Sequence, residues 1–213
     1  MGAPVEIGEV LAGKYRVDKI LGEGGMGVVV AATDTQLERQ VAIKFLLPQF
    51  SAHAEAAPRF MREARAAVKI QSEHIARVID VNTMPNGSPY MVMEMLRGSD
   101  LAHVLSDQGP LAMQEAVLYV IEACDAIAEA HSHGIVHRDL KPANLFLAQM
   151  PDGTLRVKVL DFGISKSTIT GGTGVDQSLT RTSSMMGSPL YMSPEQMKST
   201  RDVDARTDIW ALG

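Results

Sequence analysis

His137-Arg138-Asp139-Leu140-Lys141-Pro142-Ala143-Asn144 is the most informative stretch of this sequence. Within this one short loop, Asp139 can accept or orient a hydroxyl proton while Asn144 coordinates a metal ion. Pro142 suits a loop and not a helix. Lys141 adds a cation where a transferred phosphoryl group would develop charge. The stretch therefore holds the groups that phosphoryl transfer to a hydroxyl requires.

A second metal-binding group follows downstream. Asp161-Phe162-Gly163 comes directly after an apolar, strand-like stretch at residues 155–160. The carboxylate of Asp161 supplies a further oxygen donor, and Mg²⁺ prefers oxygen ligands. Asn144 and Asp161 together form a predicted divalent-cation site.

A glycine-rich segment lies near the start of the chain. Gly22-Glu23-Gly24-Gly25-Met26-Gly27 fits the pattern G-x-G-x-x-G, whose small residues let backbone N–H groups approach phosphate oxygens. A dinucleotide-binding fold needs a helix directly after the glycines, whereas here the β-branched run Val28-Val29-Val30 follows. A Walker loop is excluded because no Gly-Lys-Ser/Thr triplet occurs. The segment is therefore predicted to be a strand–loop–strand cover for phosphates, with a plain hairpin turn as the alternative.

A lysine follows this loop at the end of Val41-Ala42-Ile43-Lys44. Lysine is usually a surface residue, but beside a phosphate-binding loop Lys44 becomes a candidate cation for the α- and β-phosphates. A carboxylate must then hold the lysine in place. Glu63 is the best placed, with Glu55 and Glu73 as weaker candidates; Glu63 on a solvated helix face is the alternative.

The chain changes character along its length. Up to about Met95 it reads mostly as strands, with one helix at residues 58–70 and a hairpin at Asn86-Gly87. A long amphipathic helix is predicted over residues 111–133, with Gly134 at its C-terminal stop. Short strands are expected at residues 144–148 and 155–160, and a loop at residues 167–184. The apolar series predicted for the long helix is Val117, Val120, Ile121, Cys124, Ile127 and His131.

The bulk composition is that of a folded globular protein. Of the 213 residues, 46% are hydrophobic and 21% charged, and the net charge of −5 argues against a nucleic-acid binder. The single cysteine, Cys124, rules out a disulfide framework and is expected to fill the core. With no apolar run long enough to span a membrane and no signal peptide, a cytoplasmic location is expected.

Together, these motifs resemble those of the eukaryotic-like serine/threonine protein kinases, and most closely the bacterial members. The resemblance runs from Lys14 to Gly213. It implies an α+β fold with two lobes: residues 14–96 would form a small antiparallel-sheet lobe with one regulatory helix, and residues 97–213 a mainly helical lobe. Residues 1–13 would be an N-terminal arm.

The resemblance also implies roles for individual residues. Asp139 would be the catalytic base and Lys141 would steady the γ-phosphoryl group, with Lys44 paired to Glu63. ATP would be bound with Mg²⁺, for which Mn²⁺ is an alternative, and the metal ligands would be Asn144 and Asp161. The residues expected around the nucleotide are Leu21, Gly22, Glu23, Gly24, Gly25, Met26, Gly27, Val29, Ala42, Lys44, Met93, Glu94, Leu96, Asp100 and Phe146.

Substrate preference and regulation have sequence signals as well. Lys141 is typical of serine/threonine kinases, which predicts protein substrates, and Arg138 is typical of members activated by loop phosphorylation. Kinase–kinase self-association would allow autophosphorylation. Asp208 would brace the catalytic loop, and Ser193-Pro194-Glu195 stands where the family usually has Ala-Pro-Glu. The candidate phosphorylation sites are Thr180, Thr182, Ser183 and Ser184, each of which is alternatively a plain polar loop residue.

One departure concerns the end of the sequence. The family's large lobe continues for several helices beyond Asp208–Gly213, so the chain is expected to be a catalytic domain incomplete at its C-terminal end, with exposed apolar patches. Two other functions stay open. One is a nucleotide-binding pseudokinase or scaffold, against which the intact catalytic set argues. The other is a small-molecule phosphotransferase, against which Lys141, the stretch Ser188-Pro189-Leu190 that resembles a peptide-substrate loop, and Ser193-Pro194-Glu195 argue.

Overall fold

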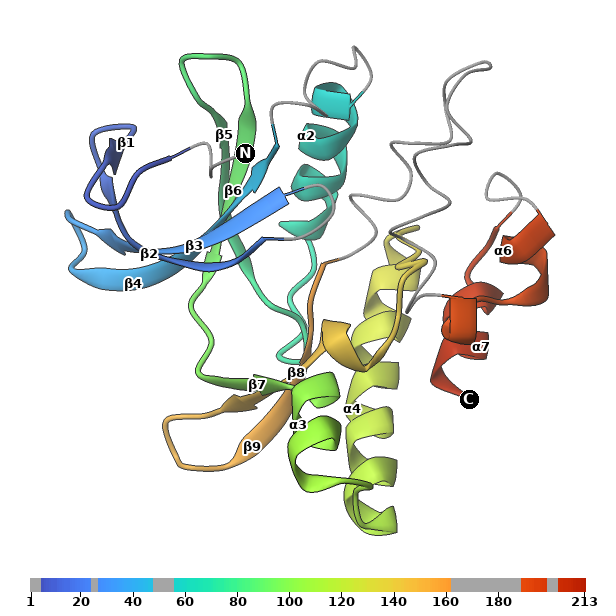
Figure 1. Ribbon diagram of the computed structural model, residues 1–213. Helices are drawn as coiled ribbons and strands as arrows, with labels where there is room; N and C mark the ends of the chain where they lie inside the picture. The colour runs from blue at the N-terminus through green and yellow to red at the C-terminus, as the bar shows by residue number, and fades with distance from the viewer. Residues whose placement is uncertain (1–4, 24–26, 48–55, 162–188, 199–202) are drawn as a thin grey trace. The chain divides into compact units, whose positions relative to one another are not determined.

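The computed structural model describes residues 5–23, 27–47, 56–161, 189–198 and 203–213 (Figure 1). Contacts divide the chain into two compact units. The first comprises Met1–Lys69 and Arg77–Leu96, and the second comprises Ile70–Ala76 and Arg97–Gly213. Residues 70–76, which the sequence analysis placed with the first lobe, thus pack with the second unit.

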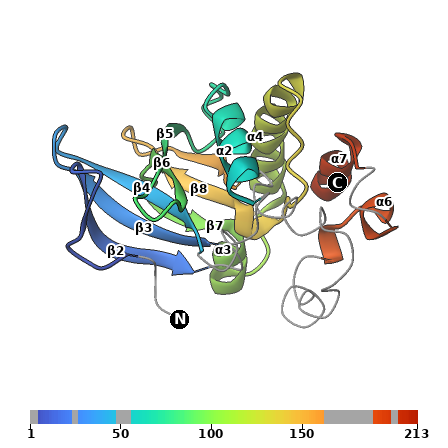
Figure 2. The same cartoon turned by 90° about the horizontal axis from the view of Figure 1, so that it is seen from above.

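The first unit is built on a six-stranded antiparallel sheet. Its strand order is β1-β2-β3-β4-β6-β5, and Figure 2 shows β2, β3 and β4 running alongside one another. The short strand β1 and the burial of Val5 and Leu11 were not apparent from the sequence pattern. The elements are β1 (Val10–Leu11), β2 (Tyr15–Glu23), β3 (Gly27–Asp34), β4 (Arg39–Leu46), α2 (Ala56–Ala67), β5 (Val78–Thr83) and β6 (Pro89–Glu94).

The sheet has one face that packs in the core of this unit and an opposite face that does not. In β4, Val41, Ile43 and Phe45 alternate with Ala42 and Lys44. The side chains of Val41, Ile43 and Phe45 lie opposite core residues of β3 and pack in the apolar cluster of this unit. Successive side chains of a strand point to opposite faces, so Ala42 and Lys44 belong to the other face.

Two hairpins connect these strands, and the one at Asn86-Gly87 is predicted from the sequence. Asn86 and Gly87 join β5 to β6, with Gly87 in the left-handed region at φ 85°. At the β3–β4 turn, the buried carboxylate of Asp34 accepts the N–H groups of Gln36 and Leu37, each at 3.1 Å. Burial alone would raise the pKa of Asp34, but these N–H groups and the nearby Lys14 ammonium hold that pKa below its usual value.

The second unit combines helices with a three-stranded sheet of order β7-β8-β9. No sequence pattern predicts α3, whose N-terminus is capped by the carboxylate of Asp100. None of the helices described combines the length and apolar character needed to cross a bilayer. The elements are β7 (Gly98–Asp100), α3 (Leu101–Gln108), α4 (Met113–Ser132), the short 3₁₀ helix η1 (Pro142–Asn144), β8 (Leu145–Gln149), β9 (Leu155–Val159), η3 (Pro189–Tyr191), α6 (Pro194–Lys198) and α7 (Arg206–Leu212).

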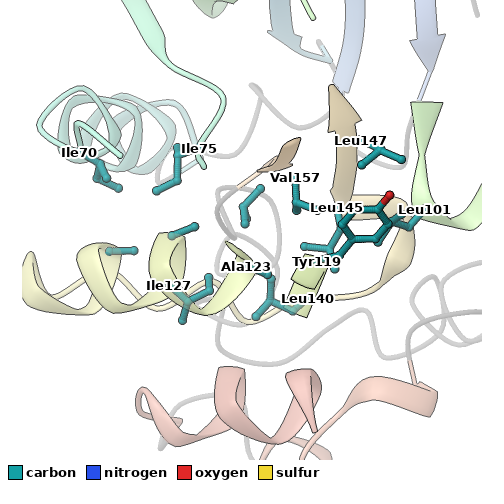
Figure 3. Close-up of a cluster of buried hydrophobic side chains, with 13 residues drawn as sticks. Ile70, Ile75, Leu101, Tyr119, Ala123, Ile127, Leu140, Leu145, Leu147 and Val157 are labelled. Carbon is teal, nitrogen blue, oxygen red and sulfur yellow. The ribbon is translucent and has the colours of Figure 1, made fainter. Parts of the chain in front are cut away.

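The long helix α4 occurs where predicted, but its buried face differs from the predicted one. Figure 3 shows Ala123 and Ile127 of α4 within the core, together with Leu140 and Val157. The other buried α4 residues are Tyr119, Ala126 and Ala130, and small alanines let neighbouring backbone approach closely. The prediction that Cys124 fills the core is wrong, because this thiol is exposed. The remaining exposed members of the predicted series are Val117, Val120 and Ile121.

Residues 70–76 are fixed to the second unit by apolar and polar contacts. Ile70 and Ile75 belong to its core (Figure 3), and Ile75 pairs with Val159 in an isolated parallel bridge. The N–H of Gln71 donates to Oε1 of Glu129 on α4 at 2.7 Å. These contacts assign the segment to the helical unit although it follows α2 directly.

Candidate active site

The predicted catalytic loop brings three polar side chains together. Oδ2 of Asp139 lies 3.2 Å from Nζ of Lys141 and accepts a hydrogen bond from Nδ2 of Asn144 at 3.3 Å. Nδ2 of Asn144 also donates to the carbonyl oxygen of Asp139 at 2.7 Å. The 3₁₀ turn Pro142–Asn144 returns the chain toward Asp139 and makes these contacts possible. The aspartate is therefore held in one orientation by two side chains of its own loop.

Two residues of this region have left-handed backbone conformations. Arg138 has φ 64° and Asp161 has φ 53°. Such conformations cost free energy for residues other than glycine and persist only where surrounding contacts impose them. Arg138 precedes the predicted catalytic base Asp139, and Asp161 is itself a predicted metal ligand, so the local backbone strain coincides with the candidate site.

Leu160 connects the catalytic loop to Asp161. Its N–H donates to the carbonyl oxygen of Asn144 at 2.9 Å, and its carbonyl oxygen accepts from Nε2 of His137 at 2.7 Å. Asp161 is the next residue in the chain, so these bonds bring the backbones carrying the two predicted metal ligands close together. His137 is fully buried, and this burial lowers the pKa of its imidazole.

Asp208 of α7 fixes the backbone before Asp139, the predicted catalytic base. Its buried carboxylate accepts the N–H of His137 and the N–H of Arg138, both at 2.8 Å. Nε2 of His131, in the last turn of α4, is the third group that contacts this carboxylate, at 2.8 Å from Oδ2 of Asp208. From the sequence, His131 is only a member of the predicted apolar series, and its position six residues before His137 gives no signal for this contact.

In the first unit, four predicted nucleotide-binding residues share the sheet face opposite the core. Lys44 of β4 lies opposite Val29 of β3, and Ala42 lies opposite Met93 of β6. Directly opposed residues of antiparallel strands project to the same face, as do positions two apart along a strand. Lys44 is 9% exposed, so its ammonium group stands on a largely covered surface.

The structure describes both ends of the glycine-rich loop, and the two ends differ in how closely they pack against neighbouring strands. Leu21 lies at an irregularity between the paired positions Ile20 and Gly22, and its side chain is exposed. A β-carbon on Gly27 would lie 2.6 Å from the carbonyl oxygen of Phe45, whereas one on Gly22 would meet no atom within 4 Å. Gly27 is thus required by packing against β4, in addition to any approach to phosphate.

Asp100 and Phe146, predicted near the ribose and the adenine, are paired across β7 and β8. Oδ1 of Asp100 accepts the N–H of His103 at 3.1 Å, and Oδ2 lies 2.5 Å from Nδ1 of His103. The carboxylate therefore caps α3. A contact between Asp100 and the ribose stays a prediction.

The remaining predicted residues lie partly inside and partly outside the described part of the chain. Glu94, expected near the nucleotide, is described: its N–H donates to the carbonyl oxygen of Arg77 at 3.0 Å, and Oε1 accepts the N–H of Arg77 at 2.9 Å. The backbone of Glu63 lies in α2, but its side chain, and hence its pairing with Lys44, falls outside the described part. Also outside are Gly24, Gly25, Met26, Thr180, Thr182, Ser183 and Ser184.

Comparison with known proteins shows the family of this chain. Residues 15–213 match the sequence pattern of the protein kinase domain. The chain belongs to the protein kinase family. This kinase chain is 38% identical over 207 residues to the serine/threonine-protein kinase pkn3 of Myxococcus xanthus, covering 97% of the chain and 37% of the relative. It is also 38% identical over 206 residues to the serine/threonine-protein kinase PknB of Mycolicibacterium smegmatis, covering 95% of the chain and 32% of that relative.

The kinase fold is shown by solved structures. The Mycobacterium tuberculosis PknI kinase domain aligns with a TM-score of 0.74 and 28% identity, covering 98% of this chain and 74% of that one. The predicted α+β kinase fold and the bacterial serine/threonine kinase relationship are therefore confirmed. The chain spans about a third of the length of these two curated relatives.

The donor set in this kinase chain fits a divalent cation held jointly with phosphates. Among the described residues, no group of three or more His, Cys, Asp or Glu side chains could hold a metal. Mg²⁺ typically takes only one or two protein oxygen ligands and completes its shell with water and substrate phosphates. The amide oxygen of Asn144 and the carboxylate of Asp161 match that requirement.

Proposed function

We propose that this chain transfers the γ-phosphoryl group of Mg·ATP to serine and threonine hydroxyls of proteins, including those of a second copy of itself. The observation that carries the proposal is the orientation of Asp139, whose Oδ2 contacts both Lys141 and Asn144. Phosphoryl transfer depends mainly on in-line positioning and on neutralisation of charge. A constrained carboxylate beside a cation meets both needs.

Asp139 would orient the incoming hydroxyl and receive its proton as the new oxygen–phosphorus bond forms and the bond from the γ-phosphorus to the β,γ-bridging oxygen breaks, with ADP as the leaving group. Nζ of Lys141, at 3.2 Å from Oδ2, pairs with this carboxylate and would contact the transferred group. Because Nδ2 of Asn144 donates to Asp139, its Oδ1 is the atom that would ligate a cation. Asp161 would provide the other protein ligand, and a bound Mg²⁺ supplies charge neutralisation at the phosphates.

The sheet face of the first unit would bind the nucleotide. Val29, Ala42 and Met93 provide apolar surface for a base, and Lys44 on the same face provides a cation for the α- and β-phosphates. The backbones of Glu94 and Leu96 would hydrogen-bond the adenine. Glu63 is proposed as the carboxylate partner of Lys44.

A direct test measures phosphate transfer from γ-labelled ATP to a generic protein substrate with the full chain. We expect phosphoserine or phosphothreonine, and we expect Lys44→Met and Asp139→Asn each to lower kcat by at least about a hundredfold. Asp107→Asn, at an exposed position of α3, is the matched control. Omission of divalent cations should abolish transfer, and addition of Mg²⁺ or Mn²⁺ should restore it.

Other outcomes would point to the rival functions. ATP binding without transfer by the unaltered chain would indicate a nucleotide-binding scaffold. Transfer to a small-molecule hydroxyl and not to protein would indicate a small-molecule phosphotransferase. Label that survives Asp139→Asn would contradict the proposed role of this carboxylate.

Loop phosphorylation is proposed as the activating step. The candidate acceptors are Thr180, Thr182, Ser183 and Ser184, and Arg138 would contact the phosphate. Phosphatase treatment of autophosphorylated protein should then lower activity, and Mg·ATP should restore it. Unchanged activity after complete dephosphorylation would contradict this step.

A further inference from the structure

Three buried polar side chains connect the last helices to the catalytic loop. Ser193 precedes α6, Gln196 lies within α6 and Thr207 lies in α7. Oγ of Ser193 lies 2.7 Å from Oγ1 of Thr207, and Oγ1 of Thr207 lies 3.0 Å from Oε1 of Gln196. Nε2 of Gln196 donates to the carbonyl oxygen of Arg138 at 2.6 Å. The series thus ends on the backbone of the residue before Asp139.

The hydrogen-bonding capacity of each group determines the direction of this series. A carbonyl oxygen only accepts, so Gln196 must turn its NH₂ group toward Arg138. Its Oε1 is then left to accept the single hydroxyl proton of Thr207, and Oγ1 of Thr207 in turn accepts from Ser193. Oγ of Ser193 accepts the N–H of Gln196 at 3.3 Å, which is the N-cap arrangement for α6. Each of the three side chains thereby orients the next.

The peptide group joining Arg138 to Asp139 is held from both sides. Its carbonyl oxygen accepts from Gln196, and its N–H, which belongs to Asp139, donates to Nδ1 of His137 at 3.2 Å. The preceding N–H, that of Arg138, donates to Asp208. These contacts impose the left-handed conformation of Arg138, and the plane of this peptide sets the direction in which the Asp139 side chain leaves the backbone.

We infer that Gln196 is a positioning residue for Asp139, and that Ser193 and Thr207 orient its amide. The serine at position 193 is then a functional part of this chain, because an alanine there would remove the hydroxyl that donates to Thr207. The inference rests on the proposed kinase activity, since it assigns Gln196 a task in that same site. It gives α6 a role in catalysis without contact to any reacting atom.

Kinetics of the full chain test the inference with near-isosteric variants. Gln196→Met and Thr207→Val remove hydrogen-bonding groups at nearly constant shape, Thr207→Ser keeps the hydroxyl, and Gln108→Met at an exposed position of α3 is the matched control. We expect Gln196→Met and Thr207→Val to lower kcat about ten- to a hundredfold, with KM for ATP changed less than about twofold. Thr207→Ser should recover most of the loss seen in Thr207→Val.

Hydrogen exchange of the loop backbone is the second measurement. The N–H groups of His137, Arg138 and Asp139 are hydrogen-bonded in the structure and should exchange faster in Gln196→Met, while β8 and β9 keep their protection. Equal losses of kcat in Thr207→Ser and Thr207→Val, a loss confined to KM, or unchanged loop exchange would overturn the inference. If the unaltered chain transfers no phosphate, the proposed function fails, and the exchange result alone decides whether Gln196 positions the loop.

Discussion

The backbone N–H of Asp139 donates a hydrogen bond to Nδ1 of His137 at 3.2 Å. Because Nε2 of this imidazole donates to the carbonyl oxygen of Leu160 at 2.7 Å, the ring carries its one proton on Nε2 and is neutral. A second proton on Nδ1 would face the N–H of Asp139. The buried imidazole thus supports the candidate catalytic aspartate only in its neutral form.

A pH dependence of stability follows from this neutral histidine. The pKa of His137 is lowered by burial, so below its ordinary pKa of 6.5 the unfolded chain binds a proton that the folded chain does not. The contribution of His137 to stability is therefore complete above that pH and is lost as the pH falls toward the folded-state pKa. His137→Gln keeps a donor and an acceptor but cannot titrate.

The measurement is urea unfolding between about pH 7.5 and pH 5. We expect the free energy of unfolding to fall less steeply with decreasing pH in His137→Gln than in the unaltered chain. His133→Gln, at an exposed position, controls for removal of one imidazole. Parallel pH curves for His137→Gln and the unaltered chain would contradict the prediction.

Two glycines of the glycine-rich loop should respond differently to the same substitution. A β-carbon on Gly27 would lie 2.6 Å from the carbonyl oxygen of Phe45, and one on Gly22 would meet nothing within 4 Å. We expect Gly27→Ala to lower the free energy of unfolding by about 1–3 kcal/mol through overpacking. Gly22→Ala should change it by less than about 0.5 kcal/mol. Thermal unfolding of the two variants in the absence of nucleotide compares them, and equal losses would refute the packing role of Gly27.

Replacing Asp208 by asparagine should weaken the fold around the catalytic loop. The carboxylate accepts hydrogen bonds from Arg138, His137 and His131. An asparagine would direct its NH₂ group at one or more of these donors and leave them unsatisfied, at a cost of at least about 1–3 kcal/mol. Denaturant unfolding of Asp208→Asn, beside the exposed Asp125→Asn on α4, provides the comparison. Indistinguishable midpoints would show that these bonds do not stabilise the loop.

Two isoleucines of α4 differ in exposure, one on its buried face and one on its exposed face. Ile127 is 1% exposed and Ile121 is 53% exposed. Ile127→Ala should therefore lower the free energy of unfolding by about 2–5 kcal/mol through cavity formation. Ile121→Ala should change it by less than about 0.5 kcal/mol. A large loss in Ile121→Ala would mean that this side chain is covered in solution.

The α4 example shows where sequence patterns reach their limit. Periodicity located the helix, but its apolar residues lie on more than one side, so the pattern could not identify the buried face. Bulky Val117 and Ile121 are exposed, while Ala123 and Ala126 are buried. Close approach of neighbouring backbone favours the small residues, and that approach depends on elements distant in sequence.

Short elements were the other failure of sequence reasoning. β1 has 2 residues and β7 has 3, too few for a periodic signal, and their existence depends on pairing with β2 and β8. The helix α3 depends on the cap formed by Asp100, a residue that the sequence analysis assigned to the ribose. By contrast, β2, β4 and β6 have alternating or apolar patterns long enough to be predicted.

The loop from His137 to Asn144 was recognisable from sequence alone because its chemistry resides in residue types at short spacings. The family and the candidate chemistry follow from the order of Asp139, Lys141, Asn144 and Asp161 and from the strands that precede them. The resemblance already assigned Asp208 to brace this loop. Only the tertiary structure showed that Asp208, 70 residues from Arg138, accepts the N–H of Arg138, and that Gln196, 58 residues from Arg138, donates to its carbonyl oxygen. The reason is physical: a local motif lists the groups that react, but hydrogen bonds from distant elements orient them, and nothing in the local sequence encodes those partners.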